Sequence, residues 1–463
     1  MDDKRQKNQE DLASKAKIGS EASDGAMRGP ESFKAVGATE SLAETEHIME
    51  EVLDKENLRE ALSKVLENKG AAGIDGMTVD KLPAYLKDNW KRIRKELLEA
   101  KYAPRAVRRL EIPKADGKSK RMLGIPCAID RFIQTALQQV LQRHWDGTFS
   151  QHSYGFRPGK SQHQAIKQAQ EYVSSGLRWV VDLDLEKFFD RVNHDILMSR
   201  IAKRVKDKRV LKLVRAFLNA GMMDDGLVKP TEEGVPQGGP LSPILSNLLL
   251  DDLDKELEKR GLRFVRFADD CNTYVASQRA GERVMESITK FLSKKLRLKV
   301  NEEKSAVGRP WQRKFLGFTF TNQKEPRRRI APAALKRVKD KIRKLTCRKR
   351  GHSLRQIIEE LTSYLRGWIG YFRYCQTPTV LQNLEKWLRR KLRCLVWKRW
   401  KRGSTRFKRL REMGLTITQA KEGAGSGAHG PWRMSRTPPI NSALSVKYFQ
   451  SLGLPILKCR DTA

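Results

Sequence analysis

Acidic side chains on two segments are the residues of this sequence best suited to carry out a reaction. In VVDLDLEKFFD, residues 180–190, Asp182 and Asp184 alternate with apolar residues. Side chains on a strand alternate between its two faces, so these two acids share a face. In FVRFADDCNTYV, residues 264–275, Asp269 and Asp270 lie between two β-rich runs. An Asp pair at a hairpin turn has a simple alternative explanation, because Asp favours turns.

The combination of the two segments points to metal-assisted chemistry. Buried carboxylates are costly unless they are paired or bound to a metal. Oxygen donors without a nearby Cys or His suit Mg²⁺, a hard cation. Two such ions activate a 3′-hydroxyl and stabilise a pyrophosphate leaving group. In a chain with a net charge of +38, the acids therefore predict nucleotidyl transfer within a basic groove.

The composition narrows the range of partners. The 463 residues include 93 Lys and Arg against 55 Asp and Glu. Such an excess of one charge indicates a polyanionic partner, nucleic acid first and a membrane surface second. The sequence has no apolar run long enough to span a membrane and no apolar stretch of a secretory signal at its start. Six scattered cysteines without a CxxC pair argue against a zinc module and a disulfide framework. We therefore expect reduced thiols in a cytoplasmic protein.

The elements that must hold the acids can be read along the chain. Residues 1–45 have the composition of a flexible tail, and helical spacing begins near residue 46 and runs to Gly70, a candidate C-cap. Residues 331–420 are helical and contribute about +20 to the charge. Between them we expect a basic hairpin over 101–126 with its turn at Asp116–Gly117, followed by a helix over 130–142. A buried strand is expected around 178–185. A Gly/Pro loop and a long helix over 234–261 then lead to a second hairpin over 263–277.

Seven motifs in this order resemble those of reverse transcriptases, and specifically the reverse transcriptase/maturase proteins encoded by bacterial group II introns. A four-residue string such as FADD occurs by chance, whereas seven motifs in order are very specific. The resemblance spans roughly residues 46–435 and continues through YLRGWIGYF (364–372) into the basic helices. The motifs are IPKADGKSKRMLGIP (112–126), SYGFRPGKS (153–161), VDLDLEKFFDRVNHD (181–195), GVPQGGPLSPILSNLLLDDLDKEL (234–257), FADD (267–270), LKVNEEKS (298–305) and KFLGFTF (314–320).

The resemblance implies an α+β right-hand polymerase, with fingers and palm followed by an all-helical thumb. We expect a flexible tail at 1–45, fingers and palm at 46–325 and a helical thumb and maturase domain at 326–402. A small basic region that resembles a DNA-binding module follows at 403–463. Many relatives end in an HNH nuclease built on paired CxxC motifs, which are absent here. The chain thus resembles the endonuclease-lacking, class C-like lineage.

Carried onto this sequence, the resemblance assigns catalysis and metal binding to Asp184, Asp269 and Asp270, with Leu185 lending its backbone carbonyl to one ion. The implied cofactor is a pair of Mg²⁺ ions, for which Mn²⁺ can substitute. Asp182 is interpreted instead as a supporting salt-bridge partner. The family more often has Tyr before Ala-Asp-Asp; Phe267 removes a hydroxyl there but keeps a ring, and we expect activity to survive.

Five further residues are expected to bind the incoming dNTP. Phe189 resembles the steric gate that excludes a ribose 2′-hydroxyl, the alternative being a plain core aromatic residue. Lys114 and Arg121 lie on the basic hairpin and could clamp the triphosphate, although each alone also fits a solvated charge. Gln237 lies in a loop that resembles the one packed against the templating base pair. Lys304 resembles a lysine that protonates or orients pyrophosphate, with a surface lysine as the alternative.

Two functions follow from the resemblance and can coexist. The first is RNA-directed DNA polymerisation, with an RNA template, a DNA primer, dNTPs and target DNA as partners during retrohoming. The second is binding of the parent group II intron RNA as a splicing maturase, through the basic helices and their interleaved Trp368, Trp387, Trp397 and Trp400; the alternative for most of these tryptophans is a helical core. A different bacterial reverse transcriptase (retron, diversity-generating or defence-associated) is a third reading, against which YLRGWIGYF and the long basic thumb count. No membrane partner is expected, and the site of action would be the bacterial nucleoid.

Overall fold

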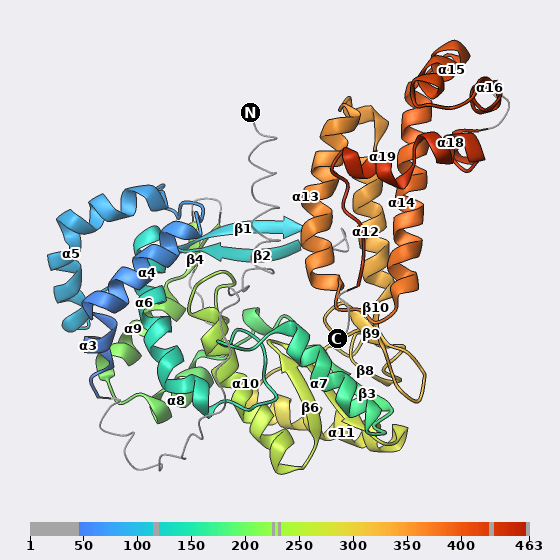
Figure 1. Ribbon diagram of the computed structural model, residues 1–463. Coiled ribbons are helices and arrows are strands. Elements are labelled where there is room, and N and C mark those ends of the chain that lie inside the picture. Colours follow the sequence, from blue (N-terminus) through green and yellow to red (C-terminus); the bar gives the residue numbers. More distant parts are fainter. Residues whose placement is uncertain (1–45, 114–119, 225–226, 230–232, 426–429, 460–463) are drawn as a thin grey trace, which may run out of the picture. The chain divides into compact units, whose positions relative to one another are not determined.

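The protein divides into two units, each with its own core. The computed structural model describes residues 46–113, 120–224, 227–229, 233–425 and 430–459 (Figure 1). Within these, residues 46–313 form the first unit and residues 314–459 the second. The tail at 1–45, Lys114 and the Asp116–Gly117 turn lie outside the described residues. The domain limits expected at 325 and 402 stay predictions.

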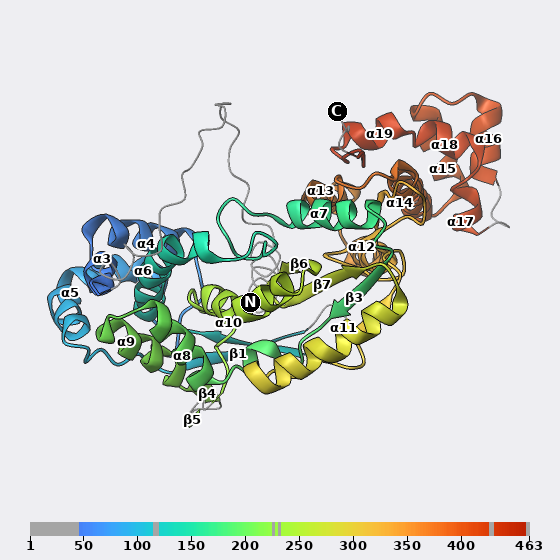
Figure 2. The same ribbon diagram turned by 90° about the horizontal axis from the view of Figure 1, so that it is seen from below.

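The central sheet of the first unit carries both acidic segments. Its antiparallel strands run in the order β6-β7-β3-β8. Helix α11 packs so closely on one face that a Cβ at Gly281 would lie 2.6 Å from Val307 and 3.6 Å from Val181, and Figure 2 shows this helix running beside β3. The bounds are β3 Trp179–Leu183, β6 Arg263–Phe267, β7 Asp270–Val275, β8 Ala306–Gly308, α10 Ser242–Lys259 and α11 Gln278–Phe291.

A second four-stranded sheet, in the order β2-β1-β4-β5, contains the basic hairpin. Strands β1 (Val107–Pro113) and β2 (Lys120–Ile125) pair antiparallel, which confirms the expected hairpin. Strands β4 (Met222–Asp224) and β5 (Leu227–Lys229) extend it and were not predicted, because three residues are too few for a recognisable alternation.

The helices of the first unit differ from expectation at one place. The predicted helix from residue 46 to Gly70 is two helices, because the carboxylate of Asp54 accepts hydrogen bonds from the N–H groups of Glu56 and Asn57 and starts a new helix. The second helix ends at Glu67, and Lys69 rather than Gly70 takes the left-handed conformation, with φ 44°. The bounds are α3 Ile48–Val52, α4 Lys55–Glu67, α5 Leu82–Leu98, α6 Ala128–Trp145, α7 Gln162–Ser174, α8 His194–Arg204 and α9 Lys208–Asn219.

The second unit is helical apart from one small hairpin, β9 (Phe318–Phe320) with β10 (Arg328–Ile330). Fully buried aliphatic side chains on its three long helices form the core, among them Val338, Leu361 and Leu388. Of the four tryptophans, Trp397 is buried and the other three are half-buried, so the helical-core alternative holds in full only for Trp397. The bounds are α12 Pro332–Leu345, α13 Leu354–Phe372, α14 Pro378–Arg399, α15 Gly403–Glu412, α16 Ile417–Gly425, α17 Pro431–Met434, α18 Pro438–Ala443 and α19 Val446–Ser451. None of the helices in the described parts of the chain could cross a membrane.

Candidate active site

The register of the central sheet brings the acidic segments to one end. Leu183 on β3 pairs with Cys271 on β7, so Asp184 and Asp270 are the next residues along the two strands. The β6–β7 hairpin closes through Ala268 and Asp269. The Asp-Asp turn, residues 267–270, therefore lies beside the end of β3. Two strands that are distant in sequence deliver three carboxylates to neighbouring positions.

Cross-strand pairs share a face of the sheet, which fixes the direction of several side chains. Asp182 pairs with Asn272, and Phe267 pairs with Asp270. Because residues two apart on a strand share a face, Phe267, Asp270, Asn272 and Asp182 all point to the side away from helix α11. We refer to this side as the acidic face.

Asp184 is held by the segment that follows helix α11. Its N–H donates to Ser305 Oγ at 3.0 Å, and its carbonyl accepts the N–H of Asn301 at 2.8 Å. Lys304 Nζ lies 3.8 Å from Asp184 Oδ1, with 61% and 36% of the two side chains exposed. A pair this exposed adds little stability. It does bring the predicted pyrophosphate lysine next to a predicted metal ligand.

The backbone at Leu185 fits the role expected of its carbonyl. Leu185 pairs with Val300 across an antiparallel bridge. The hydrogen bonds of that bridge run from Asn301 to Asp184 and from Glu186 to Lys299. Leu185 is thus a non-hydrogen-bonded position, whose carbonyl points away from Val300.

The donor set fits a hard divalent cation by its chemistry, since Asp184, Asp269, Asp270 and the Leu185 carbonyl offer only oxygen. Within the described ranges, however, no three His, Cys, Asp or Glu side chains are already gathered as a metal site. The three-carboxylate cage therefore stays a prediction.

Asp182 has the supporting role that its sequence suggested. Arg313 Nη2 lies 2.7 Å from Asp182 Oδ2, and Arg313 Nε donates to the same oxygen at 2.9 Å. The amide of Asn272, turned so that its nitrogen faces the carboxylate, donates to Oδ1 at 2.9 Å. A guanidinium thus neutralises Asp182, which confirms it as a salt-bridge partner.

A buried arginine that the sequence analysis missed braces the Asp-Asp turn. The Arg266 side chain is fully buried and makes a bidentate ion pair with Asp254 of α10, at 2.5 and 2.7 Å. Its Nη1 donates to the carbonyl of Ala268 at 2.9 Å, and its Nη2 donates to Ser153 Oγ at 2.8 Å. Ala268 has φ +57°, a strained conformation for a residue with a Cβ. Burial raises the pKa of Asp254, and the guanidinium opposes that shift. The one available signal was an arginine enclosed between the apolar residues Val265 and Phe267.

The predicted gate residue packs against the Gly/Pro loop, residues 234–239. The Phe189 carbonyl accepts the N–H of Val235 at 2.7 Å. Gly234 has φ +94°, and a Cβ there would lie 2.9 Å from the Phe189 carbonyl oxygen. Phe189 itself is half-buried, with its ring 5.1 Å from that of Phe188. Only a glycine at position 234 allows the loop to come this close to the Phe189 carbonyl. The loop therefore holds the main chain of the predicted gate residue, Phe189, in place.

The same loop also contacts the basic hairpin. The N–H of Gly124 on β2 donates to the carbonyl of Gln237 at 2.8 Å, and a Cβ at Gly238 would lie 3.1 Å from the Gly124 carbonyl oxygen. The main chain of Arg121 lies three residues earlier on β2, opposite Ile112. Phe189, Gln237 and the hairpin strand are therefore parts of one contiguous surface, whereas Lys114 lies outside the described residues.

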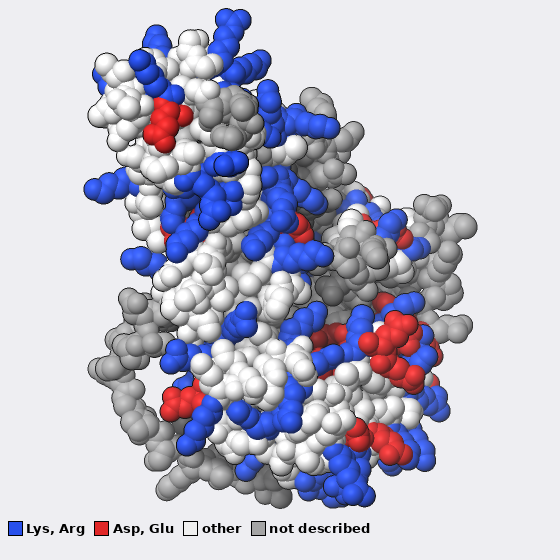
Figure 3. Space-filling model, turned by 90° about the vertical axis from the view of Figure 1, so that its right-hand side faces the viewer, with Lys and Arg blue, Asp and Glu red and all other residues white. Residues whose placement is uncertain are grey.

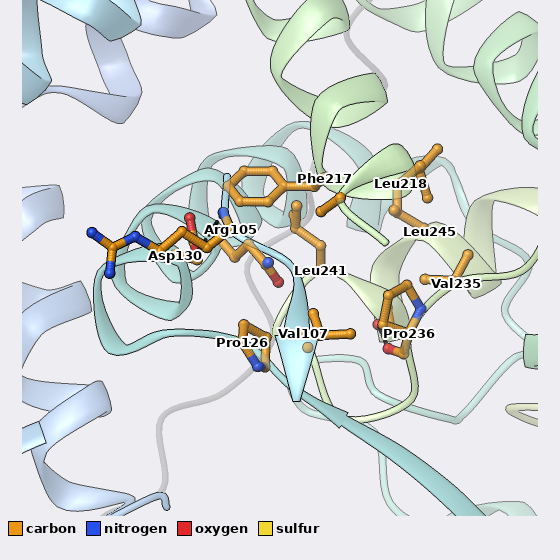
Figure 4. A pocket seen from close by; sticks show the side chains of 14 residues that line it. Arg105, Val107, Pro126, Asp130, Phe217, Leu218, Val235, Pro236, Leu241 and Leu245 are labelled. Carbon is orange, nitrogen blue, oxygen red and sulfur yellow. Dashed lines mark hydrogen bonds between the residues drawn. The ribbon is translucent and has the colours of Figure 1, made fainter. Parts of the chain in front are cut away.

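A small apolar pocket lies behind the loop and ends at a carboxyl group (Figure 4). Val107, Pro236 and Leu241 line it, and Asp130 of α6 forms part of its wall. Asp130 accepts hydrogen bonds from Tyr102 Oη at 2.7 Å and from the N–H of Arg105 at 3.2 Å. Burial raises the pKa of this carboxyl to about 6. Asp130 thus ties the chain just before β1 to helix α6, a role without a motif in the sequence.

Two protein families match this chain, in the order that the fold suggests. Residues 112–320 match the family described as reverse transcriptase (RNA-dependent DNA polymerase). They contain the central sheet, the Gly/Pro loop and the acidic segments, so the first unit carries a reverse transcriptase domain with the fingers and palm fold. Residues 335–414 match the group II intron, maturase-specific domain. The chain thus carries a reverse transcriptase domain followed by a group II intron maturase-specific domain.

The chain is similar to curated proteins, one of which carries a name that agrees with this assignment. The chain is 38% identical over 231 residues to "Protein YkfC" of Escherichia coli strain K12, a match that covers 49% of this chain and 60% of the relative. It is 33% identical over 254 residues to "Group II intron-encoded protein LtrA" of Lactococcus lactis subsp. cremoris, covering 55% and 41%. The chain therefore matches between about two fifths and three fifths of the length of these relatives. Among solved structures, a partial "Cas6-RT-Cas1--Cas2 complex" aligns with a TM-score of 0.35 at 24% identity, over 53% of this chain and 42% of that one.

Proposed function

We propose that this protein is an RNA-directed DNA polymerase that copies group II intron RNA into cDNA, and that it also binds the parent intron RNA as a splicing maturase during retrohoming. The observation that carries the polymerase proposal is the register that brings Asp184 beside the Asp-Asp turn inside a reverse transcriptase domain. Three carboxylates at the end of one sheet, in a chain of net charge +38, suit a reaction between polyanions.

In nucleotidyl transfer, the acidic residues would bind the metal and Lys304 would act on the pyrophosphate. Asp184, Asp269, Asp270 and the Leu185 carbonyl would hold two Mg²⁺ ions, for which Mn²⁺ could substitute. When bound, the metal supplies charge stabilisation at the attacking hydroxyl and at the leaving pyrophosphate. Lys304 orients or protonates the pyrophosphate, a role supported by its 3.8 Å approach to Asp184.

The incoming dNTP lies between the gate and the basic hairpin. Phe189 excludes a ribose 2′-hydroxyl, and Gln237 packs beside the templating base pair. Lys114 and Arg121 hold the triphosphate, Arg121 with the bidentate geometry of a guanidinium. The contacts that join Phe189, the Gly/Pro loop and Gly124 support this grouping.

Primer extension on poly(rA)/oligo(dT) with Mg²⁺ tests the polymerase proposal. We expect cDNA from the wild-type protein and none above background from Asp269→Ala, whose RNA affinity should stay within a few-fold of wild type. Asp252→Ala is the matched control, because Asp252 of helix α10 forms an ion pair with Arg200 of helix α8 and is not one of the proposed metal ligands. Wild-type protein that makes no cDNA, or a collapse of RNA binding in Asp269→Ala, would contradict the proposal.

The maturase function rests on a separate observation in the second unit. Residues 331–420, which include the maturase-specific match, hold 25 Lys and Arg against 5 Asp and Glu. In the upper half of Figure 3, many Lys and Arg side chains lie on the surface with few acidic side chains among them. Helices dense in cations hold RNA through phosphate and shape contacts. Splicing of a group II intron RNA with and without the protein tests this function, including in the Asp269→Ala variant, which we expect to splice normally.

A further inference from the structure

The loop that precedes helix α7 presents an exposed aromatic ring next to the Asp-Asp turn. Phe156 is 48% exposed, and it is the only large hydrophobic side chain with such exposure among the described residues of the first unit. Its ring centroid lies 6.2 Å from that of Phe267, the residue before Ala268, at an interplanar angle of 42°. Phe267 belongs to the acidic face. The Phe156 ring therefore borders the same face as Asp270.

Contacts on three sides fix the position of Phe156. Ser153 pairs with Arg266 in parallel, so the loop adds to the sheet beyond β6. A Cβ at Gly155 would lie 2.3 Å from the backbone nitrogen of Ala268, and the Gly155 carbonyl accepts the amide of Asn247 at 2.8 Å. The buried Arg157 donates to the carbonyls of Ser150 and Ser153. The loop is thus packed directly on the turn that carries the acids.

The conformation of Phe156 is unfavourable by itself. Its φ is +56°, in the left-handed region that bulky side chains rarely adopt. The buried Arg266 that donates to Ala268, which has a φ of +57°, also donates to Ser153 of this loop. One guanidinium therefore holds both strained segments. Strained backbone conformations of this kind cluster at active sites and at segments that hold ligands.

We propose that Phe156, together with Phe267, forms an aromatic platform that receives the 3′-terminal nucleotides of the primer strand. This inference rests on the proposed polymerase function. In that reaction the primer 3′-hydroxyl must reach the three carboxylates, so the strand that lies nearest the Asp-Asp turn is the primer. Aromatic rings bind nucleotides of any sequence through stacking and apolar contact, which suits a polymerase that extends every primer end. Phe156 is thus a residue that positions the primer.

The sheet geometry agrees with this order. Neighbouring strands lie about 4.8 Å apart. Counted from β3, which ends at Leu183 just before Asp184, the Phe267 strand β6 is two strands away and the Phe156 loop is three. Asp184 therefore lies at one side of the sheet end, the Asp-Asp turn lies next, and the Phe156 ring lies at the other side beside Phe267, so a primer held on the two rings can direct its terminus toward the carboxylates.

Three substitutions separate the ring from its backbone conformation. Phe156→Ala removes the ring but keeps a Cβ at positive φ. Phe156→Asn also removes the ring, and Asn tolerates the left-handed region. Phe156→Tyr keeps the ring and is the matched control. Thermal melts check that all three variants fold as wild type does.

The readout is retention of a fluorescent DNA primer on an RNA template, measured by anisotropy and by dissociation rate, which needs no catalysis. We expect Phe156→Ala and Phe156→Asn to release the duplex about five- to tenfold faster, with the dNTP KM within twofold of wild type at saturating primer. Phe156→Tyr should stay within twofold in both measurements. Wild-type retention in Phe156→Asn, or an effect confined to the dNTP KM, would overturn the proposal.

Crosslinking identifies the strand. A photoreactive nucleotide at the primer 3′ end should label the peptide that contains residue 156, and the same nucleotide in the opposite template position should not. Labelling from the template alone would overturn the assignment to the primer. A different pair of results would separate the two proposals. If the wild-type protein extends no primer while Phe156→Ala still releases the duplex faster, the polymerase function is contradicted and the aromatic platform stands.

Discussion

At the residue scale, counter-charge distinguishes two aspartates that share a face of one strand. Asp182 is neutralised by Arg313 at 2.7 Å, whereas the nearest cation that we find at Asp184 is Lys304, at 3.8 Å on an exposed side chain. A carboxylate already paired with a guanidinium is a poor metal ligand, since binding would separate the pair. The proposed role of Asp184 as a metal ligand is therefore supported by the charges around it, which leave its carboxylate more available than that of Asp182.

The gate assignment gives a prediction for a single residue. Phe189→Ala or Phe189→Val should raise the incorporation of rNTPs relative to dNTPs, because a shorter side chain leaves room for the 2′-hydroxyl. Single-nucleotide extension with matched rNTP and dNTP concentrations measures the ratio of kcat/KM for the two substrates. An unchanged ratio in an active variant would mean that Phe189 is an ordinary packing residue.

The residues that the sequence analysis missed share a physical feature. Arg266 and Asp130 act through buried contacts with segments distant in the chain, Asp254 and Ser153 for the first and Tyr102 for the second. Motif spacing reports residues that meet a ligand, because the ligand imposes the spacing. A side chain that supports such residues from behind is constrained only by three-dimensional packing, and it leaves no pattern along the sequence.

At the element scale, the Gly/Pro loop connects the gate to the hairpin, and Gly234 is its tightest point. Gly234→Ala should destabilise the fold by about 1–3 kcal/mol and raise the KM for dNTP, because a Cβ at φ +94° would press on the Phe189 carbonyl. Denaturant unfolding and steady-state extension measure the two effects.

Gly176→Ala is the matched control for Gly234→Ala. Gly176 has nearly the same φ, +98°, but nothing lies within 4 Å of the added Cβ. The Gly176→Ala substitution should lower the free energy of unfolding only through the strained backbone conformation, and it should leave the KM for dNTP unchanged. Equal effects of the two substitutions on that KM would show that the loop does not position the gate.

The elements themselves were predictable where periodicity was strong. The basic hairpin, the α6 helix and the Asp-Asp hairpin were expected and are present. The break at Asp54 was not, because the apolar spacing continues across it and only a side-chain cap divides the helix. Hydrogen bonds between a side chain and the nearby backbone can end one helix and start another, and the spacing of apolar residues does not reveal them.

At the scale of the whole molecule, charge leads to a prediction about salt. RNA affinity should fall steeply with salt concentration, with a slope proportional to the number of phosphates neutralised. Lys339→Gln on helix α12 should reduce that slope by about one; this lysine lies 5.7 Å from the Trp387 ring on a surface with few acids. Filter binding across a salt series measures the slope.

The control for the salt series is a lysine that is already compensated. Lys64 lies 2.6 Å from Glu60 on helix α4, so Lys64→Gln should leave the slope unchanged. Equal changes for the two variants would mean that the second unit has no special share in RNA binding.

Net charge and the order of motifs could be predicted because both are read directly from the sequence. The fold class could be predicted because the order of motifs resembles that of a known family. The division at residues 313 and 314 was not, because it depends on which segments contact one another.

The guanidinium of Arg266 has a consequence for how this protein can change over generations. It holds Asp254, Ser153 and the backbone of the turn at once, and the loss of either charged partner would strand the other in the interior. A single substitution at Arg266 or Asp254 is therefore costly, and we expect the two residues to be replaced together or not at all.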